Sequence, residues 1–160
     1  MATTPADTSA DSSAPTTSST TSTPLRVLII NAHPAVGLGL RRLVGIMPGI
    51  EVCGLAARGE DGLTCAGLTP PDVALVDAEL PNDAGIDTIR RLRDGLPMTR
   101  VVALGLYTAM RTAALAAGAH AFVLEDSGFD ALRTAIVAST SPTETDRDLA
   151  SATMPRSVTR

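Results

Sequence analysis

The chain contains no lysine and no tryptophan, and its aromatic residues are only two phenylalanines and one tyrosine. Its 13 basic residues are therefore all arginines, and with 17 acidic residues they give a formal net charge of −4. An acidic chain without a clustered basic stripe is a poor candidate for direct binding to nucleic acid. The scarcity of aromatic rings would also leave a bound flavin without stacking partners.

Cysteines and long apolar runs are equally scarce. Cys53 and Cys65 are not spaced as C-x-x-C and have no histidine cluster near them in sequence. We interpret them as two small, buried or half-buried residues in a reducing compartment. No apolar run approaches the roughly 20 residues of a membrane span. We therefore expect a cytoplasmic protein that does not bind membranes.

The composition changes along the chain and divides it into three parts. Residues 1–24 are mostly Ser and Thr with interspersed Pro, and residues 140–160 are again polar and contain Pro. Such segments bury too little apolar surface to offset their ordering entropy, so both are predicted to be disordered tails. The first tail is not a signal peptide, because it has neither a basic start nor an apolar core. Residues 25–139 have the size of one domain.

Within this domain, short aliphatic runs alternate with segments whose apolar residues are spaced by three and four, as on one face of a helix. Pro and Gly punctuate the junctions. The pattern predicts an α/β fold: a doubly wound, five-stranded parallel sheet of order 2-1-3-4-5, with five helices. The strands are predicted at Arg26–Asn31, Ile50–Ala56, Asp72–Asp77, Arg100–Gly105 and His120–Leu124.

The carboxyl ends of parallel strands meet at one crevice, where ligands of such folds bind. The stretch DVALVDAELPNDAG runs a buried strand into Asp77, and an isolated charge there is costly without a partner or an open crevice. A turn or cap is the simpler explanation for an aspartate at this place. However, Asp83 is better placed to cap the helix that starts near Ala84, so we expect Asp77 to face the crevice.

Nucleotide binding is a second possibility for this fold class. Gly37 and Gly39 suggest G-x-G, but the third glycine position of G-x-G-x-x-G is Arg42. The phosphate-binding loop of a flavodoxin-like protein would fall at residues 31–36, which contain no Ser, Thr or Gly. A flavin- or nucleotide-binding protein is therefore kept as an alternative from another class.

Four segments together resemble a known family: LRVLIINAHPAVGLGLRRLV, DVALVDAELPNDAG, RVVALG and GAHAFVLED. In this order and spacing they are similar to the receiver domain of bacterial two-component response regulators, of the NarL/FixJ type, over about residues 25–139. The resemblance implies that Asp77 occupies the phosphoacceptor position and Phe122 the position of an aromatic switch. A core or half-exposed aromatic is an equally good interpretation of Phe122.

The rest of the family's pocket is replaced. The resemblance implies two acidic residues after the first strand, a Thr or Ser after the fourth and a Lys after the fifth. This chain has Asn31 and Ala32, Gly105, and Glu125 at those positions. Mg²⁺ is held largely by carboxylate oxygens, and phosphoryl transfer depends on positioning and charge stabilisation. We therefore predict a degenerate receiver without a cofactor, not an enzyme, which acts by protein–protein contact and independently of phosphorylation.

The resemblance also implies partners. These are a histidine kinase, another regulator, or a second copy bound through the last helix with the first helix or the fourth-helix side. Members of this type continue into a DNA-reading helix-turn-helix, but the sequence after the domain is a polar tail without a helical stripe. We therefore expect no DNA-binding output domain and no direct DNA binding.

Two alternatives for the crevice stay open. In the first, Asp77 still accepts phosphate from a histidine kinase, with Mg²⁺ held loosely through Asn31. In the second, Asp77 and Glu125 lie close enough to share a proton or a cation, because crowded carboxylates raise one pKa. Against the second, we expect Glu125 to be turned out to water. The segment from Gly105 to Gly118 is shorter than in the family, which leaves the fourth helix uncertain.

Overall fold

The structure, a computed structural model, describes residues 23–138. The two predicted disordered tails lie outside the described residues, except for Thr23 and Pro24, which precede the first strand. None of the helices within residues 23–138 has the length and apolar character needed to cross a bilayer.

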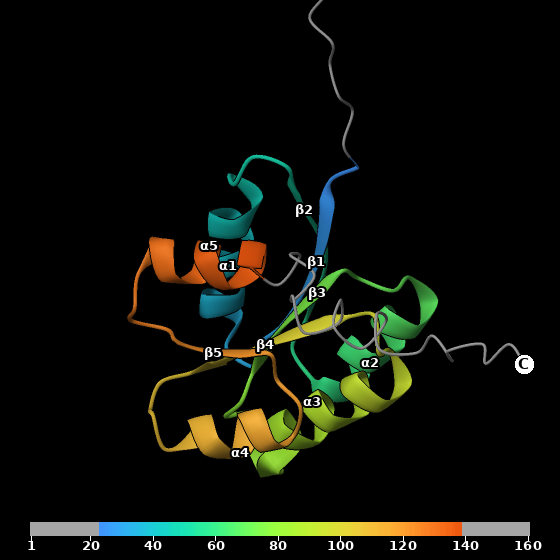
Figure 1. Ribbon diagram of the computed structural model, residues 1–160, viewed down its shortest axis with the longest axis vertical. Helices are drawn as coiled ribbons and strands as arrows, with labels where there is room; N and C mark the ends of the chain where they lie inside the picture. The colour runs from blue at the N-terminus through green and yellow to red at the C-terminus, as the bar shows by residue number, and fades with distance from the viewer. Residues whose placement is uncertain (1–22, 139–160) are drawn as a thin grey trace, which may run out of the picture.

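A five-stranded parallel sheet of order β2-β1-β3-β4-β5 forms the centre of the fold (Figure 1). The predicted fold class and strand order are confirmed. Each strand begins and ends within one residue of the predicted aliphatic run. The central strands β1, β3 and β4 are mostly buried, as expected for strands covered on both faces. The strands are β1 (Leu25–Ile30), β2 (Ile50–Ala56), β3 (Val73–Asp77), β4 (Arg100–Gly105) and β5 (Ala121–Leu124).

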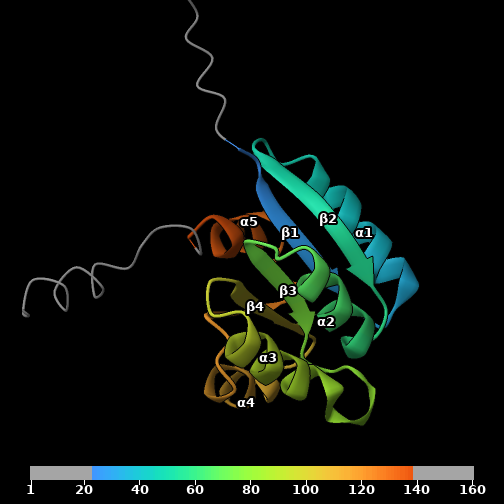
Figure 2. The same ribbon diagram turned by 90° about the vertical axis from the view of Figure 1, so that its right-hand side faces the viewer.

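Helices cover both faces of the sheet. α1 and α5 lie on one face, and α2, α3 and α4 lie on the other (Figures 1 and 2). The uncertain fourth helix is present but has only seven residues. The helices are α1 (Pro34–Gly45), α2 (Gly59–Leu68), α3 (Ala84–Gly95), α4 (Met110–Ala116) and α5 (Phe129–Ala138), and a 3₁₀ turn, η1, spans Pro81–Asp83.

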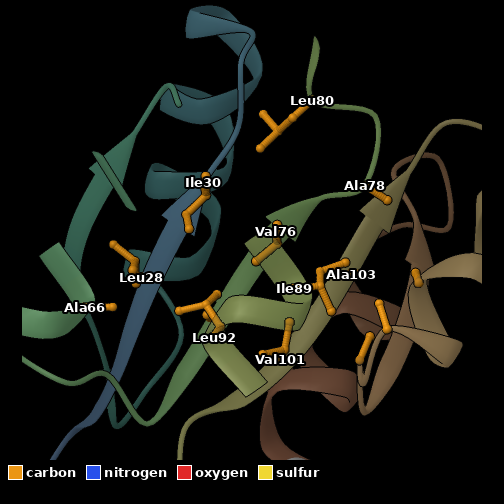
Figure 3. Packing of buried hydrophobic residues seen from close by; sticks show 14 of the residues in the cluster. Leu28, Ile30, Ala66, Val76, Ala78, Leu80, Ile89, Leu92, Val101 and Ala103 are labelled. Atoms are coloured by element: carbon orange, nitrogen blue, oxygen red, sulfur yellow. The ribbon is translucent and has the colours of Figure 1, made fainter. Parts of the chain in front are cut away.

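The core has two layers because successive strand residues point to opposite faces. Leu28, Ile30 and Val76 pack against Ile89 and Leu92 of α3 on one face (Figure 3). The alternate strand residues pack on the opposite face under α1 and α5, and they include Val27, Ile29, Leu75 and Leu104. This burial fixes the sheet and therefore the positions at which its strands end.

The edge strand β2 contains one irregularity. Val27 pairs with Val52 and Leu28 pairs with Gly54, so Cys53 has no partner in the β1–β2 register. The extra residue is a β-bulge, which locally bends the strand that carries it.

The prediction that the Asp83 side chain caps the helix at Ala84 is wrong. α3 does begin at Ala84 and Asp83 is at the N-cap position, but its side chain makes no capping hydrogen bond. A capping residue normally has an extended backbone. Asp83 instead has φ 57° and follows Asn82 at φ 60°, so two consecutive left-handed residues turn the chain into α3.

Candidate functional site

The crevice lies where β1, β3, β4 and β5 end. Backbone hydrogen bonds fasten the segments that leave these strands: the N–H of Asn31 donates to the carbonyl of Ala56 at 2.9 Å, and the N–H of Glu125 donates to that of Gly105 at 3.0 Å. The sheet therefore brings together the four strand ends that the sequence predicts, and Asn31, Asp77 and Glu125 share this crevice.

Asn31 is buried, with 2% of its surface exposed, and both ends of its amide are engaged. Its Oδ1 accepts a hydrogen bond from the backbone N–H of His33 at 2.9 Å. Its Nδ2 donates to Oε1 of Glu125 at 3.3 Å. Ala32, the next residue, packs half-buried against the core cluster under α2, α3 and α4.

Asp77 is 4% exposed at the end of β3. Its Oδ1 accepts a hydrogen bond from the backbone N–H of Glu79 at 2.8 Å. Burial raises the pKa of Asp77, and the nearby Glu79 carboxylate raises it further, while the backbone N–H groups of Glu79 and Ala32 and the charge of His33 oppose the rise. The ionised carboxylate is therefore held in a place that disfavours its charge.

The expectation that Glu125 turns out to water is wrong. The side chain is partly buried and bound to Asn31. Burial raises the pKa of Glu125, and the charge of Asp77 is the second cause of the rise. The hydrogen bond from Asn31 opposes it. The reason for the inward orientation is the buried amide of Asn31, whose donor would otherwise lack a partner.

Sequence reasoning missed Glu79, a third carboxylate of the crevice. Its charge raises the pKa values of both Asp77 and Glu125. Its Oε2 accepts a hydrogen bond from the backbone N–H of Leu106 at 3.2 Å, which ties the loop after β4 to the loop after β3. Its position two residues after Asp77 was the available signal.

Gly105 lies directly against the ring of Phe122. A Cβ on Gly105 would lie 2.8 Å from Cζ and 3.1 Å from Cε2 of Phe122. The ring therefore fills the space that a side chain at position 105 would need. Phe122 is half-buried and packs against the core cluster, as expected of a core or half-exposed aromatic. The role of an aromatic switch stays a prediction.

The donor set of this crevice does not fit Mg²⁺. The Asn31 oxygen already accepts a hydrogen bond, its Nδ2 points a donor at Glu125, and Ala32 offers no side-chain oxygen. Within residues 23–138, His, Cys, Asp and Glu side chains form no group of three or more that could hold a metal ion. The ion pairs described there join Arg90 and Arg91 to Asp87 and Glu60, outside the crevice.

The family described as "Response regulator receiver domain" matches residues 27–137. This range contains all of the crevice residues named above.

Curated relatives agree with this match. The chain is 34% identical over 114 residues to the transcriptional regulatory protein MctR of Rhizobium johnstonii, covering 70% of this chain and 53% of the relative. It is 31% identical over 105 residues to the nitrate/nitrite response regulator protein NarL of Escherichia coli, covering 64% and 49%. The chain thus spans about half the length of the curated relatives it matches.

Solved structures show the same fold. The signal receiver domain of the putative response regulator NarL from Mycobacterium tuberculosis superposes with a TM-score of 0.68 at 27% identity, over 74% of this chain and 98% of that one. A two-component response regulator of the LuxR family from Aurantimonas sp. gives a TM-score of 0.69 at 26% identity, over 81% and 97%.

Proposed function

Because the chain belongs to the response regulator receiver domain family of two-component systems, we propose that it is an atypical receiver which signals by protein–protein contact without accepting a phosphoryl group. Asp77 holds the phosphoacceptor position in this proposal, and Asn31, Ala32, Gly105 and Glu125 make up a degenerate pocket around it. The proposal includes that the domain is not an enzyme and uses no cofactor.

The observation that carries the proposal is the charge of the crevice. The charge of Glu79 raises the pKa of Asp77, and the charges of Asp77 and Glu79 raise the pKa of Glu125. Two unit charges on the order of 6 Å apart repel by about 3 kcal/mol at an effective dielectric constant of ~20. A phosphoryl group would add roughly 1.5 to 2 further negative charges to this cluster.

Phosphoryl transfer to Asp77 would need the opposite arrangement. The transferred group passes through a state with charge spread over its equatorial oxygens, which cations must stabilise. At the position where the family carries a Lys, Glu125 supplies a carboxylate, and the chain contains no lysine that could replace it. Both the approach of the phosphodonor and the phosphorylated product are therefore disfavoured.

Internal contacts supply a reason why the domain needs no phosphate to hold its shape near the crevice. Glu79 binds the N–H of Leu106 and so holds the loop after β4. The Phe122 ring is already packed into the space at Gly105. We infer that the surface formed by α4, β5 and α5 has one resting arrangement, set by the chain's own side chains.

The partner is a protein: a histidine kinase, another regulator or a second copy of the chain. The face between α4, β5 and α5 supports this, since it carries an apolar groove of about 490 Å³ bordered by Phe122, Leu124 and Ala131. On the other candidate face, Leu38 and Ile46 of α1 and its C-terminal turn are exposed large apolar residues. Exposed apolar side chains at one face are typical of association surfaces.

The test is a phosphorylation assay read by intact mass. The purified chain is incubated with acetyl phosphate and Mg²⁺ beside a typical receiver as the positive control. We expect the positive control to gain one phosphate and this chain to gain none. A stable phosphate on the wild-type chain that is lost in Asp77→Asn would overturn the proposal.

A matched variant rearranges the charges of the crevice without changing its net charge. Asn31→Asp, Ala32→Asp and Glu125→Lys together rebuild the family's acidic pair and its cation around Asp77. We expect this triple variant to bind Mg²⁺ at least tenfold more tightly than the wild-type chain, measured by calorimetry. Equal affinity of the two proteins would show that these positions do not determine metal binding.

The phosphorylatable receiver is the second candidate, favoured by the buried Asp77 at the end of β3. It requires Asn31 Oδ1 as a ligand, although that atom accepts the His33 N–H. The same mass assay decides between the two. The flavin-binding alternative has no observation in its favour.

A further inference from the structure

A small cavity between the edge strand β2 and helix α2 is bordered by both cysteines. Its volume is about 180 Å³, room for roughly six water molecules at ~30 Å³ each. The residues that line it are Arg26, Leu28, Cys53, Cys65, Leu68 and Thr69. Cys53 and Cys65 are 12 positions apart in sequence, and both line this one cavity.

The position of Cys53 allows it to move toward α2. Cys53 is the residue without a partner in the β1–β2 register, and β2 is at the edge of the sheet. A disulfide needs Cβ atoms about 3.8 Å apart. The extra residue of a bulge is unpaired, so a shift of Cys53 toward α2 would break no register pair with β1.

The two thiols differ in accessibility. Cys65 is exposed on α2, and Cys53 is half-buried. Burial raises the pKa of the Cys53 thiol, and the guanidinium of Arg26 partly opposes the rise. Since the thiolate is the nucleophile, Cys65 is the thiol that meets an oxidant first, and Cys53 is the thiol that reacts second across the cavity.

We propose that Cys53 and Cys65 are a reversible oxidation site, which a hydroperoxide converts into an intramolecular disulfide joining β2 to α2. The Cys65 thiolate attacks one oxygen of the hydroperoxide, the O–O bond breaks, and Cys65 sulfenic acid forms with release of an alcohol or water. The Cys53 thiolate then attacks the Cys65 sulfur, the S–O bond breaks, and hydroxide leaves as water after taking a proton. The two thiols supply the two electrons that reduce the hydroperoxide.

The bond would act on the crevice through the segment it closes. Residues between Cys53 and Cys65 include Ala56, whose carbonyl accepts the N–H of Asn31 at 2.9 Å. They also include the first turn of α2. Oxidation therefore fixes the segment against which Asn31 is held, whether or not Asp77 is ever phosphorylated.

The test uses the full chain, fully reduced and then treated with hydrogen peroxide in small molar excess. We expect the intact mass to fall by two hydrogen atoms and to return after dithiothreitol. Trypsin cleaves after Arg58, so Cys53 and Cys65 fall in separate peptides that only the disulfide holds together. The linked pair of peptides should be absent from the matched variants Cys53→Ser and Cys65→Ser.

A rate measurement on the reduced wild-type protein gives a second readout that does not depend on how the variants fold. We expect iodoacetamide to alkylate Cys65 about tenfold faster than Cys53, because Cys53 is the more buried thiol. Disulfide found only between two chains would overturn the proposal. So would stepwise oxidation of Cys65 to sulfinic acid while Cys53 stays a free thiol.

Discussion

Asn31 and Glu125 form a pair in the crevice, although they lie 94 positions apart. The amide donates to the carboxylate, and this hydrogen bond opposes the rise in the pKa of Glu125 that burial causes. An aspartate at position 31 would instead set two carboxylates against each other. The amide after β1 and the acid after β5 are therefore one unit, and replacing either alone disturbs the other.

Asp77 carries a cost in stability when ionised. Its raised pKa means that the ionised form is less favourable in the folded state than in the unfolded state. We expect Asp77→Asn, which keeps the acceptor for the Glu79 N–H, to raise the free energy of unfolding at pH 7 by about 1 kcal/mol. Urea unfolding measures this gain.

The gain in stability from Asp77→Asn should shrink as the pH falls toward 4, because Asp77 of the wild-type protein then becomes protonated and no longer destabilises the folded state. A gain that stays constant from pH 7 to pH 4 would show that the charge of Asp77 is not its cause. Asp83→Asn, at an exposed position with no capping bond, is the matched control and should change stability by less than about 0.5 kcal/mol.

The ring of Phe122 leaves no room for a side chain at Gly105. A Cβ at this position would lie 2.8 Å from Phe122 Cζ, so the ring must leave its place in Gly105→Ala. We expect a loss of about 1–3 kcal/mol in the free energy of unfolding, typical of an overpacked site. Gly39→Ala is the control, since nothing lies within 4 Å of its added Cβ, and in a helix this change stabilises by roughly 0.5–1 kcal/mol.

A double-mutant cycle assigns the effect of Gly105→Ala to the contact. In a Phe122→Leu background, Gly105→Ala should lower the free energy of unfolding by at most half as much as it does in the wild-type chain, because the smaller side chain frees the space. Additive losses in the double variant would mean that the added methyl group disturbs something other than the ring.

At the scale of elements, the contact between α2 and α3 depends on Gly59. A Cβ there would overlap the hydroxyl of Thr88 on α3. We expect Gly59→Ala to lower the free energy of unfolding by about 1–3 kcal/mol. Gly67→Ala in the same helix has open space around its Cβ and should not destabilise the protein. Equal effects in thermal unfolding would contradict this packing.

The strands were predictable from the sequence, but the contacts between their ends were not. Runs such as Val73–Val76 by themselves predict a buried strand, because burial on both faces requires continuous aliphatic residues. A strand that ends in a carboxylate likewise pointed to Asp77. The inward turn of Glu125 depends on a buried amide far away in the chain, and the left-handed backbone at Asp83 depends on the turn before it. Local patterns carry neither piece of information.

At the scale of the whole molecule, two kinds of titrating group act in opposite directions. The raised pKa values of Asp77 and Glu125 mean that stability rises as the pH falls through their folded values, and is lost as the pH rises through them. The pKa of His120 is lowered by burial and by the charges of Arg100 and Arg93. The stability that neutral His120 contributes is present above about pH 6.5. It is lost as the pH falls toward the lowered pKa of His120 in the folded protein.

These opposite slopes partly offset each other in the wild-type chain as the pH falls below about 6.5. In Asp77→Asn/Glu125→Gln the contribution of these two carboxylates is removed and that of His120 is kept, so stability should fall with decreasing pH. In His120→Gln, stability should instead rise with decreasing pH. Urea midpoints across this range check both slopes, and parallel profiles for the two variants would exclude the assignment.

The central place of β1 in the sheet has a consequence for synthesis on the ribosome. β1 pairs with β2 on one side and with β3 on the other, so the first strand made must wait for residue 77 before both of its edges are satisfied. Parallel neighbours need a crossover between them and cannot close as a local hairpin. A nascent chain that stops before β3 therefore leaves one edge of the aliphatic run Val27–Ile30 unpaired and exposed. Such exposed strands aggregate readily, so chaperones matter most at this stage.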